Sequence, residues 1–83
     1  MVMPLKQLYA ILVKDNKYTS MPYVSEDKTK LSPILEDTAK KYFIREIMLG
    51  AKIKFCSDDR IELYLNNKIV GTITVENIQT KMI

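Results

Sequence analysis

Residues 52–75 alternate between apolar and polar side chains, and this alternation constrains the fold more than any other feature of the chain. A period of two residues is typical of β-strands that bury one face and leave the other face in water. Polar turn residues divide the stretch into three segments of strand length. The apolar positions are Ile53, Phe55, Ile61, Leu63, Leu65, Ile69, Ile73 and Val75. We therefore expect three consecutive strands that share one apolar face.

The first hairpin of this stretch has a register that the alternation predicts. A turn at residues 57–59 places Phe55 opposite Ile61, so that the apolar sets of the two strands agree. The same register places Lys54 opposite Glu62, which pairs opposite charges across the strands. The remaining pairs of this register are Ile53 with Leu63 and Lys52 with Tyr64.

The second hairpin allows two different turns. A two-residue Asn-Asn loop is the local favourite for a tight turn, but it would bring Thr72 and Thr74 onto the apolar face. A three-residue loop at 66–68 keeps Ile69 and Ile73 on that face instead. Because burying threonine and exposing isoleucine both cost free energy, we predict the three-residue loop.

Two further strands are expected in the first part of the chain. Residues 6–14 are apolar on both faces, which is typical of an interior strand. After a polar turn, residues 18–24 can return as a second strand. Pro22 makes this an edge strand or one that is broken there, because proline lacks a ladder donor. Residues 25–31 are polar, and we predict a mobile loop for them.

The clearest helix signals lie between Ser32 and Gly50. Ser32 suits the N-cap and Pro33 the first helical position, whereas Gly50 suits the position after the last turn. Apolar side chains recur between them at helical spacing and form one stripe. These side chains are Leu35, Ala39, Phe43, Ile44, Ile47 and Met48. We predict one helix over this segment.

Together these elements predict one domain of the α+β class, residues 1–83, with the order ββαβββ. One helix would pack on one face of a mostly antiparallel sheet and so form two layers. The strand order stays open, because the first strand could pair with the second strand, with the last strand or with both. Residues 76–83 show no clear period, and they either extend the last strand or pack across the sheet.

The composition argues against enzyme activity. The chain has no histidine, which is the commonest general base and metal ligand. Its single cysteine, Cys56, has no imidazole partner, and its two glycines form no phosphate-binding loop. The acidic pair Asp58 and Asp59 suits a hairpin turn, where aspartate is favoured. We therefore expect no enzymatic activity, no cofactor and no metal.

Other features indicate the cellular setting. A small secreted domain would normally carry several cysteines, and the apolar run at residues 8–13 is too short to span a bilayer. The N-terminal residues also lack the pattern of a signal peptide. We expect a cytoplasmic protein with no membrane partner. The small size, the lack of catalytic groups and the Lys-, Ile- and Asn-rich usage suit a small regulatory or inhibitor-like protein of a bacterium or phage.

The two apolar faces of residues 6–14 carry the main functional prediction. One helix can cover only one face of a sheet. If Leu8, Ala10 and Leu12 face the helix, an apolar patch with a basic rim remains on the other side, as at many interaction sites. The members of this patch are Tyr9, Ile11, Val13, Tyr64 and Val70. We predict that it binds a protein partner or forms a homodimer, unless the C-terminal tail folds over it.

The polar face of residues 52–75 supports an alternative function. Basic side chains and a tyrosine on an open sheet can hold phosphates and stack on bases. The candidate nucleic-acid-binding residues are Lys52, Lys54, Arg60, Tyr64 and Lys68. The formal net charge of +3 is mild for such a module, and exposed sheet faces are polar by default, so nucleic-acid binding ranks second.

Overall fold

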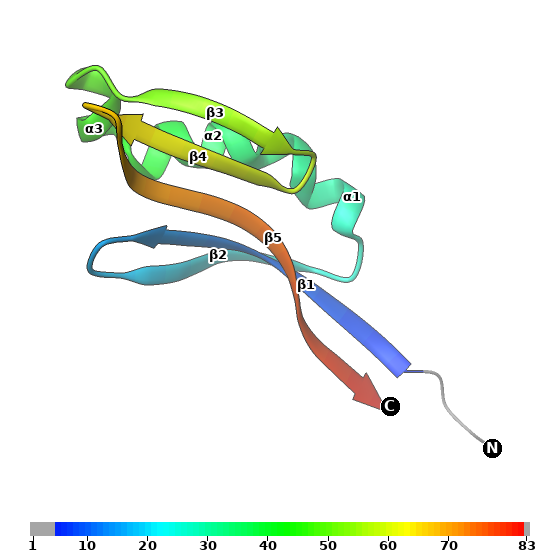
Figure 1. Cartoon of the computed structure of the whole chain (residues 1–83). Coiled ribbons are helices and arrows are strands. Elements are labelled where there is room, and N and C mark those ends of the chain that lie inside the picture. Colours follow the sequence, from blue (N-terminus) through cyan, green and yellow to red (C-terminus); the bar gives the residue numbers. More distant parts are fainter. Residues whose placement is uncertain (1–4, 83) are drawn as a thin grey trace.

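The computed structural model describes residues 5–82, which form one antiparallel sheet with helical segments on one of its faces (Figure 1). The sheet has five strands in the order β2-β1-β5-β4-β3. The strands are β1 (Leu5–Asp15), β2 (Thr19–Ser25), β3 (Lys52–Ser57), β4 (Arg60–Leu65) and β5 (Lys68–Met82). The predicted α+β class is therefore confirmed, and β1 pairs with both β2 and β5.

The helical region begins at Lys28, earlier than the sequence signals indicated. It comprises α1 (Lys28–Leu31), the 3₁₀ turn η1 (Ser32–Ile34), α2 (Leu35–Tyr42) and α3 (Ile44–Met48). The Asp27 side chain caps α1, because it accepts hydrogen bonds from the Thr29 backbone N–H at 3.0 Å and from the Thr29 hydroxyl at 2.7 Å. Part of the segment 25–31, for which we expected a loop, is therefore helical, and its Leu31 is buried.

A break in the helical region directs Phe43 toward the sheet. Phe43 separates α2 from α3 with φ −120° and ψ 30°, and its side chain is buried. Its ring lies against Gly71 of β5, where an added Cβ would overlap the ring. A glycine inside a strand often marks such a close approach. Here it lets an aromatic ring of the helical layer contact the backbone of the central strand.

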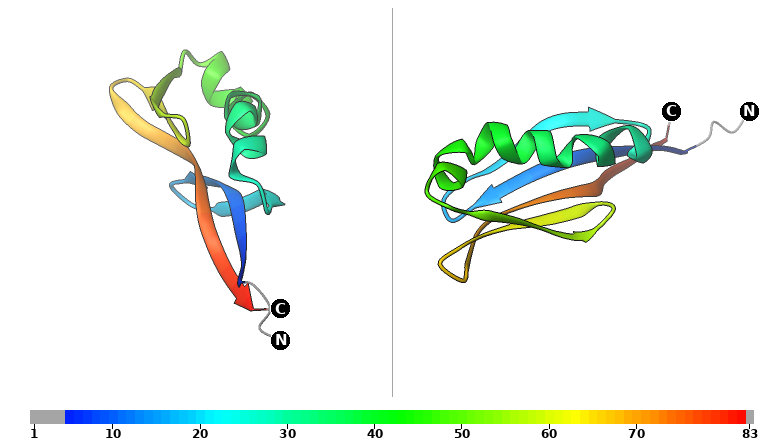
Figure 2. Two further views of the ribbon diagram at one scale, coloured as in Figure 1. Left: turned by 90° about the vertical axis from the view of Figure 1, so that its right-hand side faces the viewer. Right: turned by 90° about the horizontal axis from the view of Figure 1, so that it is seen from above.

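The core lies between the helical region and the sheet, and Figure 2 shows the helical region along one sheet face. α1 packs on β1 and β2, whereas α2 packs on β4 and β5. The largest fully buried side chains are Ile11, Ile61, Leu63 and Ile73 of the sheet. Burying one such side chain stabilises the fold by roughly 1.5–3 kcal/mol relative to leaving it in water.

The hairpin of β3 and β4 has the predicted register. Its pairs are Lys52 with Tyr64, Ile53 with Leu63, Lys54 with Glu62 and Phe55 with Ile61. The loop is shorter than predicted, because Ser57 pairs with Arg60 and leaves Asp58 and Asp59 as the turn. Cys56 is the extra residue of a β-bulge on β3. The bulge absorbs one residue and so preserves the apolar face.

The hairpin of β4 and β5 uses the tight turn, so the predicted three-residue loop is wrong. Leu65 pairs with Lys68, and Asn66 and Asn67 have φ values of 54° and 63°. Both central positions of such a two-residue turn require positive φ, which asparagine tolerates better than most residues.

A second β-bulge explains how the tight turn and a buried Ile73 occur together, a combination that the simple alternation excludes. Leu63 pairs with Gly71 but Tyr64 pairs with Ile69, so β5 contains one extra residue at this point. Ile73 is buried, as predicted. Ile69 is 46% exposed, although we expected it on the apolar face. The bulge thus allows a tight turn and a buried Ile73 in the same hairpin.

The two faces of β1 are the reverse of those that we assumed. Ile11 and Val13 belong to the core beneath the helical region, and Tyr9 packs against this core. Ala10 and Leu12 alternate with them and take the other face of the strand. The branched side chains of Ile11 and Val13 fill the space between the two layers, which only one face of the sheet provides.

β1 and β5 continue beyond the other strands as a two-stranded arm (Figure 1). Residues 5–8 pair with residues 79–82, whereas β2 pairs with β1 only from Tyr9 onward and β4 pairs with β5 only as far as Thr74. Residues 76–82 therefore extend β5 and do not fold across the sheet, which removes the cover that we considered for an apolar patch. Ile83 lies outside the described residues.

Candidate functional site

The apolar patch predicted for a protein partner is not assembled in the structure. Ile11 and Val13 are buried in the core, and Tyr9 and Val70 pack against the same core. Tyr64 alternates with the buried Leu63 on β4 and so lies on the opposite face of the sheet. The predicted face is therefore wrong, because the helical region covers Ile11 and Val13, and Ala10 and Leu12 on the other face of β1 are themselves buried.

Most of the predicted nucleic-acid-binding residues share the sheet face that points away from the helical region. They lie on β3 and β4, where they alternate with the helix-facing residues. With Glu62 they form the polar sheet face, which we define as Lys52, Lys54, Arg60, Glu62 and Tyr64. Lys68 lies apart from them at the first position of β5, beside the tight turn.

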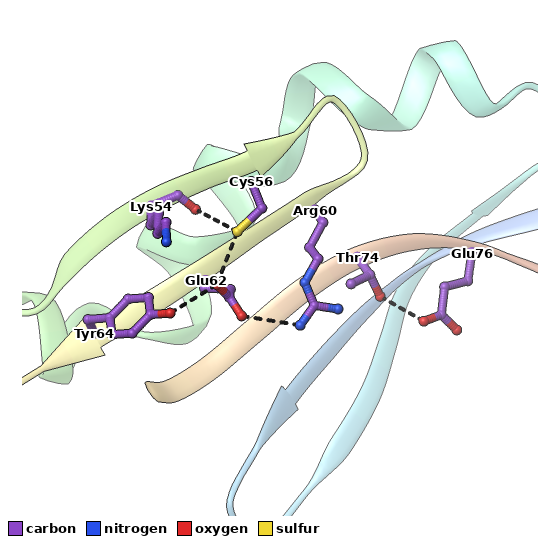
Figure 3. A network of polar contacts seen from close by, with 7 residues as sticks. All are labelled: Lys54, Cys56, Arg60, Glu62, Tyr64, Thr74 and Glu76. Carbon is purple, nitrogen blue, oxygen red and sulfur yellow. Dashed lines mark hydrogen bonds and ion pairs between the residues drawn. The ribbon is translucent and has the colours of Figure 1, made fainter. Parts of the chain in front are cut away.

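Glu62 is the centre of the polar sheet face (Figure 3). Its Oε1 accepts hydrogen bonds from the Tyr64 hydroxyl and from the Cys56 thiol, both at 3.1 Å. Its Oε2 lies 3.2 Å from Nη2 of Arg60, and the Glu62 side chain is only 13% exposed. Lys54 lies opposite Glu62 in the register, but its ammonium stands 5.8 Å from the centroid of the Tyr64 ring. The carboxylate offsets the charge of Arg60, so this face is less positive than its lysines suggest.

The hydrogen bonds of Glu62 change the pKa of three groups. The bond from Cys56, followed by those from Arg60 and Tyr64, lowers the pKa of the Glu62 carboxyl below its ordinary value. The same bonds raise the pKa of the Tyr64 phenol and of the Cys56 thiol, because a donor that ionises loses its bond and faces a negative charge. Cys56 is therefore less nucleophilic at neutral pH than an ordinary exposed thiol.

Replacing Glu62 with glutamine should increase the rate at which iodoacetamide alkylates Cys56 at neutral pH. The change removes the negative charge that raises the thiol pKa, so a larger fraction of Cys56 is thiolate. Mass spectrometry at several pH values would give the rate and the pKa. Glu76→Gln is the matched control, since Glu76 accepts a hydrogen bond from Thr74 and not from Cys56. Equal rates for wild type and Glu62→Gln would contradict the described bond.

A groove lies between the helical region and β3. It has a volume of about 810 Å³. Pro33, Leu35, Phe55 and Ile61 form its apolar wall, and polar residues, among them Lys28, Glu36 and Asp58, line the rest. Phe55 is 63% exposed, although it pairs with the fully buried Ile61 on the same sheet face. The difference arises because β3 is the outermost strand and the helical region does not cover its helix-facing side as it covers β4.

Lys28, which lines the groove, forms an ion pair with the turn between β3 and β4. Nζ of Lys28 lies 2.8 Å from Oδ2 of Asp59 and joins α1 to the turn between β3 and β4. The contact with Lys28, followed by the hydrogen bond from Ser57, lowers the pKa of Asp59. Both charged side chains are exposed, so the pair contributes little stability. Its role is to hold α1 beside the turn.

The two edges of the sheet differ in how well they are protected. β2 contains Pro22 and an irregular register opposite residues 11–13, and both features hinder the addition of another strand. β3 carries two lysines and the bulge at Cys56, which also hinder strand addition, but it has no proline, pairs with β4 alone and keeps a regular register over residues 52–55. Its outer edge therefore presents unpaired backbone N–H and C=O groups. We call this free edge, together with the adjacent groove, the β3 site.

The β3 site does not follow from the sequence. The alternation assigns Phe55 to the buried face, because Phe55 and Ile61 have the same pattern. Only the strand order distinguishes them, and the strand order was open. Pro22 indicated one edge of the sheet, and its place in β2 agrees with that prediction. The other edge has no comparable signal.

Comparisons with protein-family models, with curated proteins and with solved structures found no match for the chain. Among the residues that the structure describes, no group of three or more His, Cys, Asp or Glu side chains could hold a metal ion. Within the same residues, no helix has both the length and the apolar character needed to cross a bilayer.

Proposed function

We propose that the protein is a small non-enzymatic binding protein that captures another protein chain at the β3 site. The partner would add an extended segment to the free edge of β3 and place side chains in the groove. The observation that carries this proposal is the 63% exposure of Phe55 beside an unpaired strand edge. The proposal retains the protein partner expected from the sequence, in the cytoplasm, but it moves the binding surface from β1 to β3.

Two contributions would stabilise such a complex. Burying the Phe55 side chain would contribute roughly 1.5–3 kcal/mol, and aromatic residues are frequent hot spots of protein interfaces. Each backbone hydrogen bond gained along β3 would add about 0.5–1.5 kcal/mol. The groove supplies the side-chain specificity that backbone pairing lacks, because Pro33 and Leu35 favour apolar side chains.

Replacing Phe55 with glutamate should abolish capture of the partner. Wild type, immobilised at one terminus, would be incubated with bacterial lysate, and the retained proteins would be identified by mass spectrometry. The variant should lose the retained partner, because a charged side chain over the apolar groove would have to be desolvated on binding. Phe55 is exposed, so the substitution should leave the fold intact, which circular dichroism would verify.

Tyr18→Glu is the matched control for this experiment. Tyr18 is also an exposed aromatic residue, with 71% exposure, but it lies in the turn between β1 and β2. This variant should retain the same partner as wild type. Loss of the partner in both variants, or in neither, would overturn the proposed site.

Nucleic-acid binding by the polar sheet face is a second candidate function. Lys52, Lys54 and Tyr64 share this face, and an open sheet with basic and aromatic side chains can bind single strands. It has less support than the first proposal. Arg60 is engaged by Glu62, and Lys54 lies over the Tyr64 ring on which a base would stack.

Fluorescence anisotropy with labelled single- and double-stranded oligonucleotides would test this second function. If it operates, binding should weaken steeply with salt, since it releases counterions from phosphates. Tyr64→Ala and Lys54→Glu should each reduce the affinity, whereas Lys41→Glu, on α2, should have less effect. Affinities that both variants share with wild type would exclude this face as the binding surface.

A further inference from the structure

We infer that the segment bound at the β3 site is a strand of another protein in which apolar residues alternate with aspartate or glutamate. The inference depends on the proposed function and specifies the chemistry of the partner. The observation that supports it is that β3, the edge strand that the partner would join, has one apolar face and one basic face.

A strand added to β3 would present its side chains alternately to the two faces of the sheet. One set would lie beside Ile53 and Phe55 and enter the groove, where Leu35 provides an apolar wall. The other set would lie beside Lys52 and Lys54 on the polar sheet face. Directly opposed side chains on neighbouring strands are about 4.5–5.5 Å apart at Cβ, so each set must suit its neighbours on β3.

Lys52 and Lys54 are available for acidic side chains of the partner. Both are exposed, and within the described part of the chain neither takes part in an ion pair. The acid opposite Lys54 is Glu62, whose carboxylate already accepts hydrogen bonds from three other side chains. β3 contains no acidic residue, so an adjoining strand would meet positive charge along this face.

A second copy of the chain is a poor occupant of the same edge. An antiparallel pair of two β3 strands that is centred on Ile53 or Lys54 keeps Ile53 and Phe55 on one face and places lysine opposite lysine on the other face. Like charges directly opposite each other destabilise a strand pair. The charge of β3 therefore favours an acidic strand of another protein over the homodimer that we considered from the sequence.

Three capped synthetic peptides of equal length would test this inference, with valine alternating with glutamate, with threonine or with lysine. Binding to the full chain at low ionic strength would be followed by the NMR shifts of the β3 amides. The glutamate peptide should bind about tenfold more tightly than the lysine peptide, with the threonine peptide between them. Added salt should reduce these differences, because it screens exposed charges.

Two chain variants make the test specific to this edge. A Lys52→Glu, Lys54→Glu double variant should reverse the order of the three peptides. A Lys17→Glu, Lys41→Glu double variant has the same net charge but leaves β3 unchanged, so it should keep the wild-type order. The glutamate peptide would also be N-methylated at alternate residues, either at the odd or at the even positions. Only one of these two peptides should lose binding, because only every second N–H of the added strand faces β3.

The outcomes separate the partner chemistry from the proposed function. If all three peptides bind equally and Phe55→Glu abolishes their binding, the β3 site stands and the acidic partner is overturned. If the lysine peptide binds most tightly, the acidic partner is likewise overturned. If no peptide binds and Phe55→Glu still captures the partner, the β3 site itself is overturned.

Discussion

Replacing Ile11 with alanine should lower the free energy of unfolding by about 2–5 kcal/mol. Ile11 is fully buried and pairs with Tyr23 on β2 and with Val75 on β5, so strands on both sides would hinder collapse of the cavity. This loss is a large fraction of the roughly 5–15 kcal/mol that stabilise a typical domain. Urea unfolding followed by circular dichroism would measure it.

Ile69→Ala is the matched control, because it removes the same atoms from a residue that is 46% exposed in the same sheet. It should change the free energy of unfolding by less than about 1 kcal/mol. Equal effects of the two substitutions would contradict the burial of Ile11.

Replacing Gly71 with alanine should lower the free energy of unfolding by about 1–3 kcal/mol. The added Cβ would overlap the Phe43 ring, which is buried between the helical region and β5. Relief requires movement of the ring or of the central strand, and close packing leaves little room for either. The change would be measured by the same urea unfolding.

A double-mutant cycle identifies the source of this cost. Phe43→Leu destabilises the protein on its own, but it removes the ring that the alanine would meet. Gly71→Ala should therefore cost less in the Phe43→Leu background, with a coupling energy of about 0.5–3 kcal/mol. Strictly additive effects would show that the ring is not the obstacle at Gly71.

The two hairpins show how far a hydrophobic pattern predicts pairing. The pairs of β3 and β4 follow from the alternation, because a shift by one residue would put Lys54 and Ile61 on the same face, so that either Lys54 is buried or Ile61 is exposed. The turns do not follow from it. A β-bulge inserts one residue into a strand, so a tight Asn-Asn turn and a buried Ile73 are compatible, although the alternation alone makes them appear exclusive.

In the helical region, too, the sequence pattern predicts some features and misses others. The sequence signals place the N-cap at Ser32, because Pro33 follows it, yet the Asp27 side chain caps the first helix. α1 forms after Asp27 and places Leu31 in the core. Phe43 continues the helical spacing of apolar residues, yet the helix is interrupted there. Its ring contacts Gly71, a neighbour that is distant in the sequence.

The α+β class, the five strand-forming segments, the pairing of β3 with β4 and the buried helical positions Leu35, Ala39 and Phe43 all follow from the amino-acid pattern. These features depend on local periodicity and turn chemistry. Ile44 and Met48, which we also assigned to the apolar stripe of the helix, are exposed, so that part of the prediction is wrong. The face of β1 and the strand order do not follow from the pattern, because both faces of β1 are apolar and strand order depends on contacts between segments that are distant in the chain. That order leaves the outer edge of β3 unpaired and Phe55 in solvent, while Ile61 with the same pattern is buried on the next strand.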